Sequence, residues 1–194
     1  MRESAFTHDS YASTFGVRPG ALRQALEFAR VEPRRPSESA SILTRWMGVM
    51  DANTAGNVHG GVILRLSDEA AGLAAVRHSR GRVVTAGMDR MTFACPVYIG
   101  QLVTCFAMVN AAWRTSVEVG VRVEAEDVRT GDVHHACTAY LTMVSLDREG
   151  RPAPVPGLEP ETPDEIRRQR EAQVRRDNRL AERESIRASR VGDP

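Results

Sequence analysis

Hydrophobic and polar positions change period several times along the chain, and the longest stretch without a clean polar side covers residues 59–78. A surface helix carries one apolar stripe and a charged back, whereas nearly every side of this stretch is apolar or small. Its polar interruptions, among them Arg65, Asp68 and Glu69, fall in the middle. The pattern predicts a long helix wrapped by other structure, with Gly81 just past its last turn.

Alternation with a period of two predicts strands on both sides of this helix. One strand lies within residues 39–50, and four more lie at residues 83–93, 101–112, 114–124 and 133–146. Short turns join the last four, which favours an antiparallel sheet and an α+β fold class. A single helix cannot cover both faces of such a sheet, so we expect the sheet to curl around it. Its open edges invite pairing with a second copy.

Composition divides the chain into three parts. Residues 1–36 are polar and punctuated by Gly and Pro, and we expect an N-terminal extension of low order or with a short helix. Residues 37–150 form the domain, and residues 151–194 form a Pro-rich linker and a charged helix. Thr162, Pro163 and Glu165 are placed as cap, first helical residue and capping-box partner of that helix.

Length and charge exclude several classes of protein. A chain of 194 residues with a net charge of +1 is one domain with tails, and it offers no electrostatic case for binding nucleic acid. Cys95, Cys105 and Cys137 lie in apolar runs without metal-ligand spacing, so we expect reduced thiols and no metal site. No stretch has the composition of a signal peptide or of a membrane span, which predicts a soluble, cytoplasmic protein.

The chain resembles the hotdog-fold acyl-CoA thioesterases, in particular the bacterial short/medium-chain type and the brain-type cytosolic acyl-CoA hydrolase. The motifs that carry the resemblance are Asn57-Val58-His59-Gly60-Gly61 with Leu64, Asp68-Glu69-Ala70-Ala71-Gly72, and residues 82–85, 91–93, 96, 100, 115–119 and 144–151. The similarity extends over residues 39–184. It implies a hotdog fold, in which an antiparallel sheet wraps around one long central helix, plus a C-terminal helix.

The resemblance also implies an activity, the hydrolysis of acyl-CoA thioesters to free fatty acid and coenzyme A in fatty acid metabolism. No cofactor is implied, because coenzyme A is part of the substrate and product. Eukaryotic members fuse two hotdog repeats, and their site takes an asparagine from one repeat and an aspartate from the other. This single repeat carries both Asn57 and Asp68. The resemblance therefore implies self-association, as a dimer or a trimer of dimers, with sites shared between chains.

The residue types fit this chemistry. Thioester hydrolysis needs a base or nucleophile and a means to polarise the carbonyl. Gly60 and Gly61 place backbone N–H groups at the positive end of the helix dipole, although they could equally serve only to let the loop pack closely. Asp68 lies about two turns further on the same side, as candidate general base or nucleophile. The alternative for Asp68 is an acid that caps the helix or pairs with Arg65.

The neighbours of Asp68 by steps of three and four, Leu64, Ala71, Gly72 and Ala75, are mostly small, and we expect a partner chain to approach them closely. Glu69 points about 100° away and is interpreted as a structural partner.

Two residues of the entry loop complete the candidate site. Asn57 can hydrogen-bond both a water and a carbonyl, or it can simply cap the helix. His59 has no Ser or Cys at a motif spacing, so it is interpreted as a loop residue or a support for the oxyanion. The other histidines, among them His78, His134 and His135, are interpreted as structural.

Arg114, Thr115 and Ser116 are placed near coenzyme A by the resemblance, and Arg suits its phosphates. The alternative for these three residues is an ordinary turn into a strand, and the charged C-terminal helix is either a packing element or a coenzyme A clamp. Two other functions remain open. One is a non-catalytic acyl-CoA-binding or sensing protein with the same groove. The other is a hotdog dehydratase with His59 facing a partner's Asp68.

Overall fold

The computed structural model describes residues 32–191. Most of the predicted N-terminal extension lies outside the described residues. The elements, in chain order, are α3 (Pro36–Ser39), β1 (Ser41–Trp46), η1 (Val49–Asp51), α4 (Gly60–Ser79), β2 (Arg82–Met88), β3 (Thr92–Phe93), β4 (Leu102–Ala112), β5 (Ser116–Asp127), β6 (Asp132–Leu146) and α5 (Pro163–Val191).

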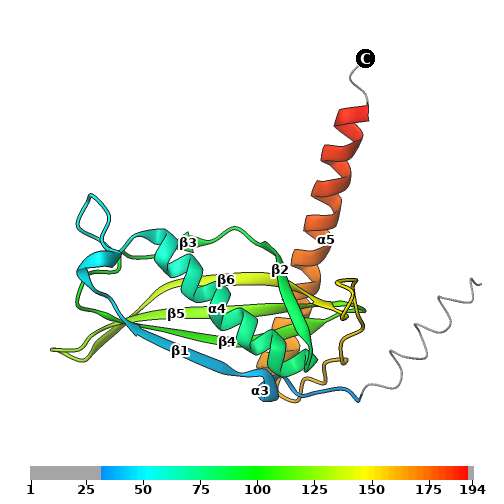
Figure 1. Ribbon diagram of the computed structural model, residues 1–194, viewed down its shortest axis with the longest axis horizontal. Coiled ribbons are helices and arrows are strands. Elements are labelled where there is room, and N and C mark those ends of the chain that lie inside the picture. The colour runs from blue at the N-terminus through cyan, green and yellow to red at the C-terminus, as the bar shows by residue number, and fades with distance from the viewer. Residues whose placement is uncertain (1–31, 192–194) are drawn as a thin grey trace, which may run out of the picture.

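The strands form one curled antiparallel sheet, with α4 across its inner face and α5 across its outer face (Figure 1). The strand order is β1-β4-β5-β6-β2, and β3 pairs with β6 beside β2. The predicted α+β hotdog architecture with a C-terminal helix is confirmed. The stretch 83–93, predicted as one strand, forms two, because residues 89–91 lie outside both strands. The Asp89 N–H still donates to the Tyr140 carbonyl of β6, and its carboxylate binds Arg179 of α5.

One side of α4 packs on the inner face of the sheet through small residues. Ala70, Ala71, Ala74 and Ala75 are fully buried, which lets the helix lie close to strands rich in Val. The opposite side keeps Leu64, Leu73 and Val76 exposed. The chain therefore wraps only one side of the helix, and the prediction of a helix covered all round is not met by a single copy.

The ends of both long helices follow local chemistry. α4 ends at Arg80, which takes the left-handed conformation (φ 53°) one residue before the predicted Gly81. At the start of α5 the Glu165 N–H donates to Thr162 Oγ1 and the Thr162 N–H donates to Glu165 Oε2, so the predicted capping box is present. No helix within residues 32–191 is long and apolar enough to cross a membrane.

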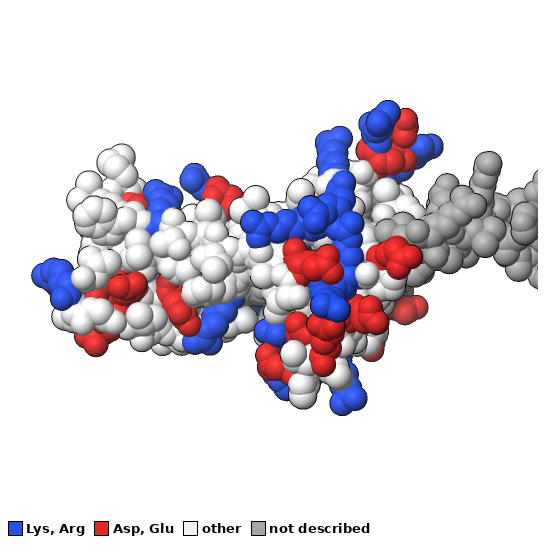
Figure 2. All heavy atoms as spheres, turned by 90° about the horizontal axis from the view of Figure 1, so that it is seen from below, with Lys and Arg blue, Asp and Glu red and all other residues white. Residues whose placement is uncertain are grey.

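Ion pairs hold α5 on the outer face. Arg175 donates to the fully buried carboxylate of Glu118 on β5 at 2.7 Å, and its guanidinium stacks 3.6 Å from the Tyr140 ring centroid. Arg179 reaches Asp89 at 2.6 Å. Figure 2 shows charged side chains of both signs gathered toward the end of the molecule that carries α5, whereas uncharged side chains dominate the other end.

Candidate active site

His59 caps the N-terminus of α4. Its Nδ1 accepts a hydrogen bond from the Gly61 N–H at 2.9 Å. A Cβ on Gly61 would lie 3.1 Å from that same nitrogen, so glycine here makes room for the capping ring. The interpretation of Asn57 as the cap is therefore wrong, and the Gly61 N–H is engaged by His59 in this structure.

The entry loop is folded around Asn53, a residue that the sequence analysis did not single out. Its Oδ1 accepts hydrogen bonds from the N–H groups of Ala55 (2.8 Å) and Asn57 (3.1 Å). Its own N–H donates to the Asn57 carbonyl at 2.7 Å. The only sequence signal for Asn53 was its place in a loop rich in Asn and Gly, which does not distinguish it from Asn57.

A pocket of about 310 Å³ opens where this loop and the start of α4 meet the segment after β3. Its volume is at the lower end of the range for small-molecule sites. Asp68 is not among the residues that line it. The lining consists of Asn53, Asn57, Val58, Gly60, Ile63, Phe93, Ala94, Cys95, Pro96 and Val97.

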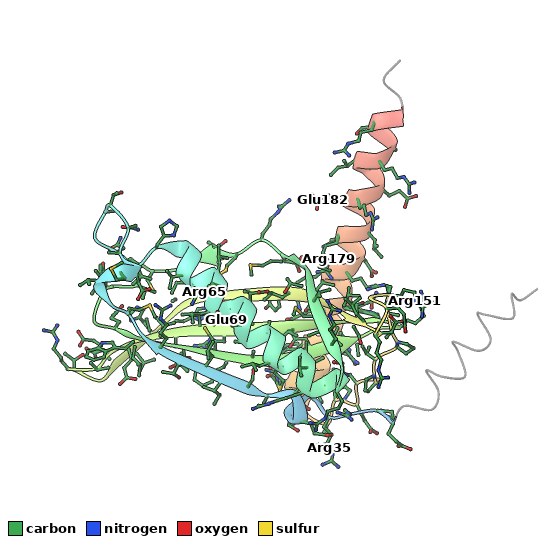
Figure 3. The ribbon with its side chains drawn as sticks, in the orientation of Figure 1. Arg35, Arg65, Glu69, Arg151, Arg179 and Glu182 are labelled. Atoms are coloured by element: carbon green, nitrogen blue, oxygen red, sulfur yellow. The ribbon has the colours of Figure 1, made fainter. Side chains whose placement is uncertain are left out.

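Asp68 lies instead against the edge strand β2. Its half-buried carboxylate accepts a hydrogen bond from Thr85 Oγ1 at 2.5 Å. Arg65 pairs with Glu69 at 3.1 Å and not with Asp68, and both of these side chains lie on the outer side of α4 (Figure 3). The alternative of an Arg65–Asp68 salt bridge is wrong, and the pairing of Glu69 with Arg65 is consistent with its interpretation as a structural partner.

The small residues beside Asp68 were expected to face a partner chain, but the structure buries two of them in the chain's own core. Ala71 and Ala75 are fully buried in the chain's own core, so a partner chain cannot approach them. Leu64 remains exposed and Gly72 half-buried. What the helix offers to a second copy is therefore the Leu64–Asp68–Gly72 side and not the alanine side.

Arg114, Thr115 and Ser116 lie in and beside the turn between β4 and β5. The Arg114 carbonyl accepts from the Val155 N–H. Val155 directly precedes Pro156, whose carbonyl contacts His78 near the end of α4. The 20-residue helix is about 30 Å long, so within one chain these residues are far from the pocket at its start.

Two of the thiols and one histidine are buried in the core. Burial raises the pKa of the Cys105 thiol to about 11 and of the Cys137 thiol to about 12, so both stay protonated near neutral pH. Burial lowers the pKa of His78, which lies far from the pocket. No cluster of three or more potential metal ligands occurs in the described part of the chain.

Residues 55–132 match the family model described as "Thioesterase superfamily". The rat cytosolic acyl coenzyme A thioester hydrolase is 38% identical over 146 residues. That alignment covers 74% of this chain but only 38% of the relative, so the chain spans less than half the length of that protein.

Solved structures match over nearly their whole length. The acyl-CoA hydrolase of Staphylococcus aureus, in complex with butyryl coenzyme A, coenzyme A and coenzyme A disulfide, is 33% identical with a TM-score of 0.74, covering 80% of this chain and 95% of its own. A hexameric acyl-CoA thioesterase is 35% identical with a TM-score of 0.76, covering 78% and 97%.

Three further structures of the Staphylococcus aureus hydrolase carry alanine in place of an aspartate, an asparagine fifteen residues before it, or a threonine seventeen residues after it. Fold, identity and coverage agree: the chain belongs to the hotdog-fold acyl-CoA thioesterases of the thioesterase superfamily.

Proposed function

We propose that this chain hydrolyses acyl-CoA thioesters to fatty acid and coenzyme A, at sites that two copies share. The observation that carries the proposal is the separation of the candidate groups. The pocket holds Asn53, Asn57 and Gly60, while Asp68 on α4 lies outside it, against Thr85 of β2. β2 is an edge strand with most of its residues exposed, and sheet edges of this kind pair with another chain.

Within such a pair, Asp68 of one copy would act at the pocket of the other. Its carboxylate would take a proton from a water, or attack the thioester directly, while the oxyanion forms at the α4 N-terminus beside Gly60. Collapse of the tetrahedral intermediate would expel the coenzyme A thiolate. In the first route the thiolate would take up the proton held by Asp68, and in the second a water would hydrolyse the acyl-aspartate anhydride to release the fatty acid. Because Arg114, Thr115 and Ser116 lie about a helix length from their own pocket, they too would serve the partner's site, near the nucleotide.

Three residues of this chain stand at the intervals of the substituted residues in the Staphylococcus aureus hydrolase, namely Asn53, Asp68 and Thr85. The match supports Asp68 as the catalytic carboxylate, acting as base or nucleophile, and adds Thr85 as the residue that orients it. It also favours Asn53 over Asn57 as the asparagine that faces the substrate, with Asn57 bracing the loop.

The test is release of free thiol from a series of acyl-CoAs of increasing chain length. We expect Asp68→Ala to lose at least about 100-fold in kcat/KM, because the reaction then lacks its base. Glu69→Ala is the matched control, since it removes an adjacent acid that pairs only with Arg65. Asn53→Ala and Asn57→Ala decide between the two asparagines. Wild-type protein that binds acyl-CoA without releasing thiol would instead be a non-catalytic binding protein.

Sharing of the site is tested by mixing inactive chains. When Asn53→Ala and Asp68→Ala chains exchange at equal amounts, half of the dimers contain one of each. Each such dimer has one intact site and one doubly defective site, so about a quarter of wild-type activity should return. If each site were built within one chain, mixing would restore nothing.

A further inference from the structure

α5 is longer than the sheet that supports it. Its contacts follow the strand order, from Glu118 on β5, which binds Arg175, to Asp89 just after β2, which binds Arg179. The helix therefore leaves the sheet at the β2 edge. Figure 1 shows its last turns standing clear of β2, and every one of residues 181–190 is exposed.

We call residues 181–190 the arm. Ten residues of helix are about 15 Å long, the width of about three strands. The side that faces the sheet earlier in α5 continues into the arm with Arg183, Ile186 and Arg190. Arg179, Glu182 and Arg187 flank these residues along the same helix. Ile186 is 47% exposed there, with nothing of its own chain beneath it.

The arm has little to keep it helical by itself. An isolated helix shorter than about 12 residues is marginal in water. The first half of α5 has short ion pairs along the helix, such as Arg167 with Glu171. Among the described residues, the ion pair of the arm is a long one, between Glu182 and Arg90 at 3.7 Å. Packing against another surface would stabilise the helical conformation of the arm, which its local contacts stabilise only weakly.

The outer face of β2 carries an exposed apolar side chain, Val84, which the arm of another copy could cover. Val83 packs toward the core, so Val84, its neighbour in the strand, points to the outer face, where it pairs with Val144 of β6. Val84 is 39% exposed, because α5 of the same chain passes over the other end of β2, at Asp89.

We propose that the arm docks on a second copy of this chain, over the outer face of that copy's β2 and β6. The inference rests on the proposed pairing of two chains through β2. Antiparallel pairing brings the C-terminal end of one β2, where α5 leaves the sheet, beside the N-terminal half of the other, where Val84 is uncovered. Ile186 of each arm then covers apolar surface of the partner, and the two arms clamp the dimer symmetrically.

The experiment places a photocrosslinking residue, p-benzoylphenylalanine, at Ile186 of the full chain. The matched control carries it at Val174, which is 59% exposed on the solvent side of the same helix. Irradiation of the Ile186 protein should give covalent dimers, with the crosslinked peptide mapping to β2 or β6 of the other copy, and the Val174 protein should give none.

A second measurement removes the arm by ending the chain after Leu180, with a chain ended after Val191 as control. Loss of two buried Ile side chains should raise the concentration at which the dimer dissociates by at least about tenfold.

The outcomes separate this inference from the proposed function. The docking of the arm is refuted if mixed dimers regain activity but Ile186 gives no crosslink, or gives one only within a chain or to another surface. The shared active site is not refuted by that result. A monomeric protein at assay concentrations overturns both. Unchanged dissociation after removal of the arm also overturns the clamp.

Discussion

Replacing Thr85 by Val tests whether the threonine hydroxyl orients the carboxylate of Asp68, which we propose as the catalytic base or nucleophile. Valine has nearly the same shape and suits an edge strand, so the change removes the hydrogen bond to Asp68 and little else. The bond is short, 2.5 Å between Thr85 Oγ1 and Asp68 Oδ1, and its acceptor is a carboxylate.

A hydrogen bond to a charged group contributes about 1.5–3 kcal/mol. Thr85 is exposed in the single chain, so water can replace part of the bond, and the lower value applies if the site stays wet. At about 1.4 kcal/mol per tenfold, kcat/KM should fall about 10-fold in a wet site and about 100-fold in a site that substrate and partner close.

The assay is thiol release at several substrate concentrations, so that kcat and KM separate. The loss should appear mainly in kcat, because the hydroxyl contacts the base and not the coenzyme A. Thr85→Ser keeps the hydroxyl and should stay near wild type, and thermal unfolding should confirm that both variants fold. A Thr85→Val enzyme with more than half of the wild-type kcat/KM would refute the assignment.

Two further predictions concern the fold. Glu118→Ala should lower the free energy of unfolding in urea by about 3 kcal/mol, because it leaves Arg175 and Asn110 without their carboxylate; a loss below about 1 kcal/mol would contradict it. Burial, aided by the charge of Arg34, lowers the pKa of His78, outweighing its bond to the Pro156 carbonyl and the charge of Glu38. Its contribution to stability is therefore present above pH about 6.5 and lost as pH falls through the folded value. His78→Gln should flatten the dependence of Tm on pH between about 7 and 5, and an unchanged slope would exclude His78 as its source.

Local pattern was sufficient for most of the architecture. The period of two in β4, β5 and β6 and the apolar stretch of α4 placed these elements within a few residues of their observed bounds. The capping box at Thr162 was also readable, because its partners lie within one turn. The pattern failed at residues 83–93, where the strand is interrupted at residues 89–91 and Asp89 binds Arg179, a residue distant in sequence.

Only part of the candidate site could be predicted from the sequence. Residue types and helix periodicity pointed to Asp68, Gly60 and the entry loop. They could not pair Asp68 with Thr85, because alternation along a strand leaves its register against other elements open. They also favoured Asn57, whereas the hydrogen bonds that organise the loop converge on Asn53.

The sequence by itself therefore determined the elements, the fold class and the chemical groups available for thioester hydrolysis, since these follow from contacts within a few residues. Only the tertiary structure decided where those groups stand: Asp68 of α4 against the edge strand β2, outside the pocket that its own chain forms, and α5 extending past that same edge. These features depend on contacts between distant segments, which packing of the whole chain selects and local propensity does not encode.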